Sequence, residues 1–235
     1  TVTHTMIKSL ENQHSNTQVR YSDQGGVEVD AQMRVLSSKS TKAFEAIYAA
    51  GDVTCVNPQL MLDDEDMEMR TWFQMRLWSQ ARLQGMYAAR CMCGEIDELT
   101  LGGGLMFDCF SHTTSFFGYK VVLLGLYNGQ TLGHEYNRAV QRAYAKYDTL
   151  LCEEKDLKKK KKKKPHDVEV FLRVTPDVEY IKLVVRKHRL VGALLIGNTD
   201  YEQAAEDLIL SRTKLSETLK SNLLNPDFDL DDYFD

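Results

Sequence analysis

The sequence predicts two joined parts, an α/β part followed by an α+β part. The first observation behind this fold class is an apolar stretch ending in a glycine and an aspartate, residues 46–53. A long helical pattern rich in small residues follows it, an order typical of α/β sheets. The second observation is a change after residue 104 to short apolar stretches separated by turns. That pattern favours an antiparallel sheet with few helices.

The first part contains a predicted turn, two short strands and a candidate ligand-binding pair. Glycines at 25–26 predict the turn, the alternating residues 27–30 an edge strand, and the apolar residues 47–50 a buried strand. Gly51 lets the backbone turn sharply, and the ionised carboxylate of Asp52 accepts hydrogen bonds from hydroxyls such as those of a ribityl or ribose group. Because α/β sheets bind nucleotides at the carboxyl ends of strands, this pair predicts a cofactor site.

The next predicted element is a helix over residues 67–92. The acidic residues 63–66 precede it, where negative charge favours the helix dipole, and Asp66 is the predicted N-cap. Gly94 is expected to end the helix. Small and apolar residues spaced three and four apart share one face, which we expect to pack closely against a sheet or another helix. These residues are Trp78, Ala81, Gly85, Ala88, Ala89 and Met92.

The second part is predicted to hold an antiparallel sheet and one helix. Short apolar stretches predict strands over 106–117, 119–126, 180–185 and 190–196. Lys187 and His188 form an expected turn, and an amphipathic pattern predicts a helix over 200–210.

Between about residues 135 and 176 we expect an inserted loop. Its centre is a run of seven lysines at 158–164, which cannot bury itself. The first interpretation is a solvated loop or an intron read as coding sequence. The alternatives are a nuclear import signal and, after it, a contact for nucleic acid or anionic lipid.

Composition narrows the class of protein. A net charge of −5 argues against a general nucleic-acid binder, and no apolar run approaches the length of a membrane span. Five cysteines without Cys-x-x-Cys spacing favour a reducing compartment, so we predict a cytoplasmic or nuclear protein. We expect Cys91 and Cys93 to be structural and take Cys55 as the better candidate for a redox-sensitive thiol. No histidine has a partner at metal-ligand spacing, so we predict no metal site.

The residues around the Gly-Asp pair resemble the second FAD-contacting segment of the pyridine nucleotide-disulfide oxidoreductases. That segment ends in an apolar-aromatic-Ala-apolar-Gly-Asp pattern, which residues 47–52 match. Lys42 and Glu45 depart from it, standing where the family has Thr and usually Pro. Further blocks resemble one branch, the family of pyridine nucleotide-disulfide oxidoreductase domain-containing protein 1. They include residues 74–82, 119–125, 192–197 and 231–235.

The resemblance implies a domain organisation and an activity. Residues 25–95 would be the end of a Rossmann-like FAD-binding domain and residues 105–235 an α+β interface domain, after a linker remnant, 1–24, from the nicotinamide-binding domain. The implied reaction is hydride transfer from NAD(P)H to FAD and then to an unknown acceptor. The family's two phosphate-binding Gly-x-Gly-x-x-Gly turns are absent from this sequence. We therefore expect the carboxyl-terminal part of a larger enzyme, not competent alone.

The resemblance also implies which residues contact the flavin. Asp52 would hold the ribityl chain, and the amino end of the following helix would point at the flavin ring. The implied cofactor-binding residues are Gly51, Asp52, Val53, Thr71, Trp72 and Gln74. No residue stands out as a catalytic acid, base or nucleophile. The alternative function is a non-catalytic, flavoprotein-derived interaction module that binds a protein partner through its sheet and its acidic-aromatic tail, residues 225–235.

Overall fold

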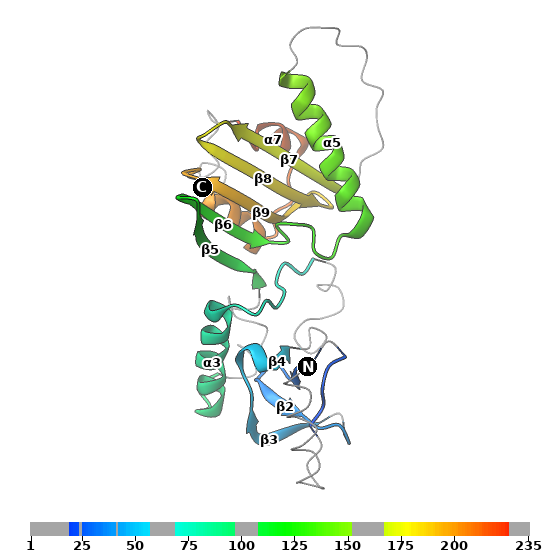
Figure 1. Cartoon of the computed structure of the whole chain (residues 1–235). Coiled ribbons are helices and arrows are strands. Elements are labelled where there is room, and N and C mark those ends of the chain that lie inside the picture. The colour runs from blue at the N-terminus through cyan, green and yellow to red at the C-terminus, as the bar shows by residue number, and fades with distance from the viewer. Residues whose placement is uncertain are drawn as a thin grey trace. The chain divides into compact units, whose positions relative to one another are not determined.

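The chain forms two compact units. The computed structural model describes residues 19–23, 25–40, 42–56, 69–96, 108–151 and 167–225. The first unit comprises Thr1–Met69 and Gln74–Phe107, and the second comprises Arg70–Phe73 and Asp108–Asp235. The short segment Arg70–Phe73 thus belongs to the second unit although its chain neighbours belong to the first. Figure 1 labels most of the elements of both units.

Within the described residues, the first unit contains a four-stranded sheet, a short 3-10 turn and one helix. Its strands are β1 (Val27–Val29), β2 (Arg34–Leu36), β3 (Ala43–Tyr48) and β4 (Thr54–Val56), in the order β3-β2-β1-β4. β1 pairs in parallel with β4 and antiparallel with β2, which pairs antiparallel with β3. The 3-10 turn η1 (Gly51–Val53) joins β3 to β4, and helix α3 (Trp78–Met92) follows.

Two expectations for these strands are wrong. β1 is an interior strand between β2 and β4, and Val29 is fully buried, whereas the alternation of 27–30 predicted an edge strand. β3 is instead an edge strand, because among the described strands only β2 pairs with it, and Ile47 in the predicted buried strand is 42% exposed. Alternation and apolar character describe a strand's faces, but its place in the sheet is decided by pairing.

Helix α3 begins later than predicted and buries a different face. It starts at Trp78, whereas the prediction began at residue 67; residues 72–77 are not helical. The acidic residues 63–66 and the N-cap Asp66 lie outside the described residues. The carboxyl end agrees, with Cys93 as C-cap and Gly94 at a φ of 69°.

The face of α3 predicted to pack is largely exposed. Trp78 is 77% exposed and Met92 62%, and of the predicted set only Ala88 is buried. The other buried positions on the helix are Gln80 and Gln84. The helix therefore packs through the side-chain amides of Gln80 and Gln84 and through Ala88.

The second unit is built on an antiparallel sheet, as predicted, but the sheet has five strands where four were expected. Its strands are β5 (Ser111–Phe116), β6 (Tyr119–Gly125), β7 (Val168–Thr175), β8 (Glu179–Arg186) and β9 (Arg189–Gly197), in the order β5-β6-β9-β8-β7. Lys187 and His188 form the β8–β9 turn with φ values of 46° and 62°. Helix α6 (Glu202–Leu210) confirms the helix predicted over 200–210. A further short helix, α7 (Glu217–Asn222), was not predicted.

The prediction of a loop over the whole of 135–176 is wrong, because a helix and a strand occupy most of the described residues in that range. Helix α5 (Gly133–Leu151) covers the start of this range, and β7 occupies its end. β7 pairs with β8 along its full length, from Val168 opposite Arg186 to Thr175 opposite Glu179. The lysine run 158–164 lies outside the described residues.

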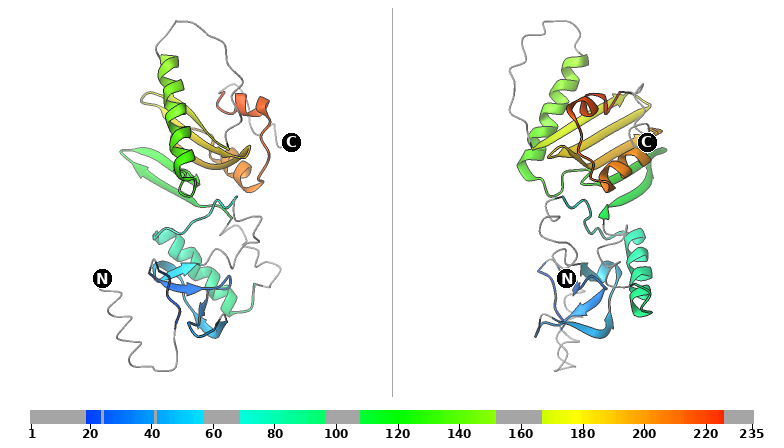
Figure 2. Two further views of the ribbon diagram at one scale, coloured as in Figure 1. Left: turned by 90° about the vertical axis from the view of Figure 1, so that its right-hand side faces the viewer. Right: turned by 180° about the vertical axis from the view of Figure 1, so that it is seen from behind.

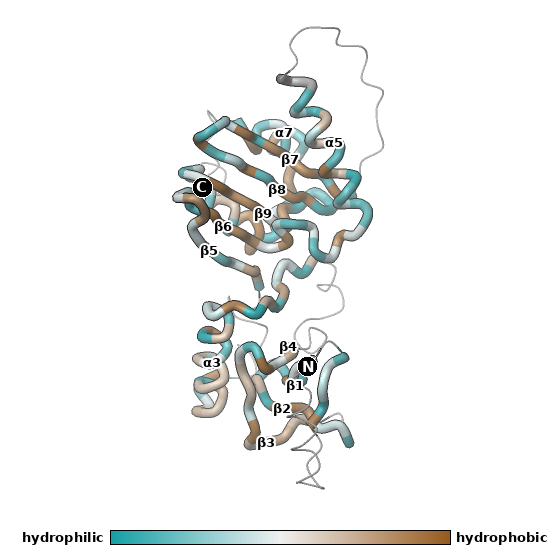
Figure 3. The backbone as a smooth tube through the Cα atoms, in the orientation of Figure 1, coloured by the Kyte–Doolittle hydropathy of each residue, from teal (hydrophilic) through white to brown (hydrophobic). Residues whose placement is uncertain are grey.

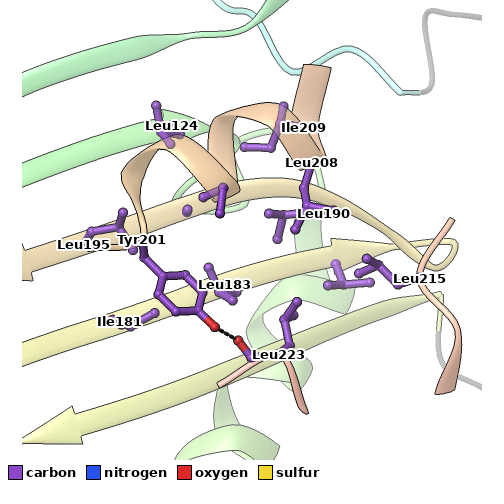
Figure 4. Close-up of a cluster of buried hydrophobic side chains, with 14 of the residues drawn as sticks. Leu124, Ile181, Leu183, Leu190, Leu195, Tyr201, Leu208, Ile209, Leu215 and Leu223 are labelled. Carbon is purple, nitrogen blue, oxygen red and sulfur yellow. Dashed lines mark hydrogen bonds between the residues drawn. The ribbon is translucent and has the colours of Figure 1, made fainter. Parts of the chain in front are cut away.

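The sheet of the second unit is covered on both faces. Helix α5 lies on one face, and helices α6 and α7 lie on the other (Figure 2). The hydrophobic core fills the α6 and α7 side, where Ile181 and Leu183 of β8 meet Leu208 of α6 (Figure 4). Hydrophobic residues are accordingly dense along β8 and β9 (Figure 3). Because strand side chains alternate, Tyr180 and Lys182 face the α5 side.

Contacts between α6 and α7 complete this core. The Tyr201 hydroxyl, at the start of α6, donates a hydrogen bond to the Leu223 carbonyl, just beyond α7 (Figure 4). None of the helices in the described ranges is long and apolar enough to cross a lipid bilayer.

Candidate cofactor site

The glycine-aspartate turn is held in place by a glutamine of α3. Gly51 is buried and has a φ of 82°, a conformation that favours glycine. Its N–H donates a hydrogen bond to the Gln84 side-chain oxygen, Oε1, at 2.8 Å. A Cβ at Gly51 would lie 3.3 Å from the Cβ of Ala81, so the turn and the helix approach closely. The small residues at these two positions permit that contact.

A buried threonine hydroxyl completes the turn. Thr54 Oγ1 donates to the Gly51 carbonyl at 2.7 Å and lies 3.2 Å from Gln84 Oε1. Thr54 and Gln84 are only 3% and 2% exposed, so these bonds form away from solvent. Buried polar groups need such partners, and here three residues supply them to one another. The turn therefore has a defined shape.

The Gln74 side chain fixes the strand after the turn. Its Oε1 accepts a hydrogen bond from the Val56 N–H at 3.0 Å, and its Nε2 donates to the Thr54 carbonyl at 3.0 Å. The amide thus satisfies the backbone of β4 as a neighbouring strand would. These bonds give Gln74 a supporting role; its predicted contact with a cofactor stays a prediction.

Asp52 and Val53 are the exposed residues of the turn. Val53 is 51% exposed and the Asp52 side chain is also exposed. Within the described part of the chain, no hydrogen bond or ion pair engages the Asp52 carboxylate. The turn therefore presents one free acceptor group beside an apolar side chain. A carboxylate in that state can bind hydroxyl or N–H donors.

Thr71 and Trp72 do not lie at the start of α3, where the resemblance placed them. Both are buried in the second unit, and the helix begins only at Trp78. Thr71 Oγ1 donates to the Asp108 carbonyl at 2.6 Å, and Trp72 has the Arg70 guanidinium 5.1 Å from its ring centroid. The Thr71 hydroxyl hydrogen is therefore used within the protein. A flavin-contacting role for Thr71 and Trp72 stays a prediction.

Sequence reasoning missed the buried glutamines of α3. Gln80 Oε1 accepts a hydrogen bond from the Met75 N–H at 2.8 Å, which satisfies the backbone just before the helix. Gln84 holds Gly51, as described above. The two glutamines are four residues apart on a helix otherwise rich in small residues, a spacing that places them on one face. That spacing is the sequence feature that could have predicted a buried pair of glutamines.

The cysteines show no disulfide among the four that the structure describes. Burial raises the pKa of Cys109 to about 11 and raises that of Cys91, so both thiols stay protonated at neutral pH. Cys55 is half-buried in β4, and its redox sensitivity stays a prediction. The described residues contain no group of three or more potential metal ligands.

Comparison with known proteins identifies homologues of the chain. No protein-family model matches the chain. It is 38% identical over 218 residues to pyridine nucleotide-disulfide oxidoreductase domain-containing protein 1 of Drosophila melanogaster, a match that covers 92% of this chain and 36% of that protein. The chain is a homologue of that protein. The Dictyostelium discoideum and human proteins of the same name are 34% and 37% identical over 227 and 213 residues.

These relatives confirm the resemblance identified in the sequence. The chain spans about a third of their length, 35% and 33% for the Dictyostelium and human proteins. Among solved structures, the fold is similar to a chain of the covalent putidaredoxin reductase–putidaredoxin complex, with a TM-score of 0.52 at 12% identity. That match covers 92% of this chain and 37% of the other. The predicted fold class, α/β followed by α+β, agrees with this likeness.

Proposed function

We propose that this chain is part of an FAD-dependent oxidoreductase that takes hydride from NAD(P)H and passes electrons to an acceptor. The names of its relatives and its structural likeness to a reductase complex support an oxidoreductase. In such an enzyme the flavin, when bound, supplies the electron-accepting ring. The chain's own residues bind and orient it.

The observation that carries the proposal is the free Asp52 carboxylate on a fixed turn. A carboxylate accepts hydrogen bonds from hydroxyls and repels phosphates, so Asp52 suits the ribityl or ribose part of FAD. The Gly51 N–H is already bonded to Gln84 Oε1, so it does not serve as a phosphate donor. Gly51 instead shapes the turn, and Val53 offers an exposed apolar contact beside the carboxylate.

The test uses a chimera of full length. This chain replaces the matching 218 residues of the Drosophila melanogaster relative, and flavin absorbance of the purified protein reports bound FAD. We expect the parent chimera to bind FAD and to be bleached by NADH or NADPH without oxygen. Asp52→Ala should reduce FAD affinity about tenfold or more, since hydrogen bonds to a charged group are lost.

The matched control is Glu45→Ala, which removes an exposed carboxylate from β3. We expect this variant to bind FAD as the parent does. Equal FAD affinity in Asp52→Ala and the parent would overturn the role of Asp52. Circular dichroism of both variants checks that the fold is retained.

A second candidate function is a non-catalytic interaction module. The tip of the β5–β6 hairpin favours it, because Phe116 and Phe117 are 66% and 87% exposed and contact each other edge to face at 4.5 Å between ring centroids. Exposed aromatic pairs of this kind are common in protein interfaces. A chimera that is folded but takes up no FAD would contradict the enzyme and favour the module.

A further inference from the structure

Lys182 is a buried cation without an acidic partner. It lies on β8, on the sheet face opposite the main core, and is only 6% exposed. Its Nζ contacts two neutral oxygens, Tyr136 Oη at 3.0 Å and Asn128 Oδ1 at 3.4 Å. The ammonium also lies 5.7 Å from the centroid of the Tyr136 ring. Within the described ranges, no carboxylate pairs with it.

A second buried lysine in the same unit shows the usual arrangement. Lys220 is 5% exposed, and its Nζ lies 2.5 Å from Glu169 Oε1 and 3.2 Å from Glu217 Oε1. A buried charge is costly unless it is paired, which Lys220 satisfies with two carboxylates. Lys182 has the same burial without that compensation, and burial lowers its pKa. Its environment therefore favours an anion from outside the chain.

An open cavity lies beside Lys182. Its volume is about 470 Å³, which falls in the range of roughly 300–1,000 Å³ typical of small-molecule sites. Its polar lining is Asn128, Tyr136, Asn137, Gln141, Tyr144 and Lys182, and no acidic residue lines it. The ammonium and the amide and hydroxyl groups of this lining can all donate hydrogen bonds.

The hydrogen-bond inventory leaves donors for a ligand. Lys182 Nζ has three hydrogens and two protein partners. The Tyr144 and Tyr180 hydroxyls lie 3.0 Å apart, and one of their two hydrogens serves that bond. The other hydroxyl hydrogen remains for a further acceptor. A ligand with several acceptor oxygens would match this set.

The site is preformed by the loop between β6 and α5. Gly129 has a φ of 61°, and a Cβ there would come within 2.1 Å of Tyr136 Cγ, so the loop backbone presses against the tyrosine ring. The Tyr136 hydroxyl in turn donates to Asn128 Oδ1 at 3.0 Å. These contacts hold the groups around Lys182 in position before any ligand arrives, which lowers the entropy cost of binding.

We propose that this cavity binds the oxyanion group of a small molecule, a carboxylate or a phosphate, with Lys182 as its counter-charge and Tyr144 as a hydroxyl donor. The proposal is independent of the flavin site, because every residue involved belongs to the second unit. The shared chemistry is a compact anion with several acceptor oxygens.

The test is calorimetric titration of the 235-residue chain with inorganic phosphate and, separately, with succinate. We expect at least one of the two to bind, and Lys182→Met to weaken that binding about tenfold or more, because a charged hydrogen bond is lost. The control is Lys146→Met, which removes an exposed lysine of α5 and should leave binding unchanged. Binding of phosphate alone or succinate alone identifies which oxyanion the cavity prefers.

A second variant keeps the test decisive if Lys182→Met fails to fold. Tyr144→Phe removes one hydroxyl from a side chain that is 42% exposed, so its fold should be retained. We expect it to weaken anion binding several-fold. Absence of binding of both anions up to about 20 mM would overturn the proposal, since an anion that pairs with a buried cation is expected to bind more tightly than that. Equal binding by the parent and either Lys182→Met or a folded Tyr144→Phe would overturn the assigned roles.

Discussion

Replacing Gln84 by leucine tests how the candidate site is held together. In the parent, Gln84 Oε1 accepts the Gly51 N–H at 2.8 Å, while the Thr54 hydroxyl keeps a second acceptor in the Gly51 carbonyl at 2.7 Å. The substitution therefore leaves one buried donor unsatisfied, the Gly51 N–H. Such a group costs about 1–3 kcal/mol, and leucine fills a similar volume. This corresponds to about a 5- to 150-fold change in the equilibrium between the folded turn, in which the Gly51 N–H is protected from solvent, and an opened turn, in which it is exposed.

Amide hydrogen exchange measured by NMR reports this change directly. Protection of the Gly51 N–H should fall by that factor in Gln84→Leu, and the urea midpoint followed by circular dichroism should fall with it. The control is Gln203→Leu on α6, where an exposed amide bonds to Asp207 at 3.0 Å; we expect a change within about 0.5 kcal/mol. Unchanged protection of Gly51 in Gln84→Leu would refute the reasoning.

Two further predictions concern buried ionisable groups. Burial lowers the pKa of Lys182 below its usual 10.5. At pH values between the folded-state pKa and 10.5 the unfolded state therefore binds more protons than the folded state, so the stability of the parent increases with pH in that range. Lys182→Met should be the more stable protein near neutral pH, and its lead over the parent should shrink as the pH rises toward 10.5. A difference in urea midpoint that does not change with pH would contradict this. Because burial raises the pKa of Cys109 to about 11, iodoacetamide at about pH 8 should modify the exposed Cys93 much faster than it modifies Cys109. Mass spectrometry of the labelled chain measures the two rates. Equal labelling rates would contradict that account.

The β8–β9 hairpin of the second unit was predictable because its signals are local. The β8 and β9 strands are short apolar runs, and the Lys187-His188 pair between them forms a tight turn in which both residues have positive φ. A two-residue turn fixes the register of the strands that it joins. Sequence periodicity and turn length therefore determine this hairpin with little help from distant residues.

Helix α5 and strand β7 were missed because the lysine run dominated the interpretation of their region. A charge run excludes burial only of its own residues. The flanking sequence carried other signals, since Tyr136 and Ala139 are buried at helical spacing and β7 is rich in apolar residues. Arg142 of α5 also donates to the Val168 carbonyl of β7 at 3.1 Å. Contacts of that kind join elements far apart in sequence.

The start of α3 depended on contacts that no local pattern shows. The residues before Trp78 have helical spacing, yet Gln74 bonds the backbone of β4 and Phe73 stacks on Phe110 at 4.3 Å between ring centroids. A helix that included them would give up these bonds, so tertiary structure overrides the local preference. The same contacts explain why Thr71 and Trp72 lie elsewhere than the resemblance implied.

The two residues of the glycine-aspartate pair have different roles, and the sequence alone does not show this difference. A motif predicts that both residues serve one ligand, but the N–H of Gly51 is bonded to a glutamine 33 positions later in the chain, and only Asp52 is left with a free polar group. A change at Gln84 should therefore loosen the turn, whereas a change at Asp52 should leave the turn intact and remove a ligand contact. Stability and flavin binding thus respond separately to the two substitutions, which distinguishes a supporting residue from a binding residue at the same turn.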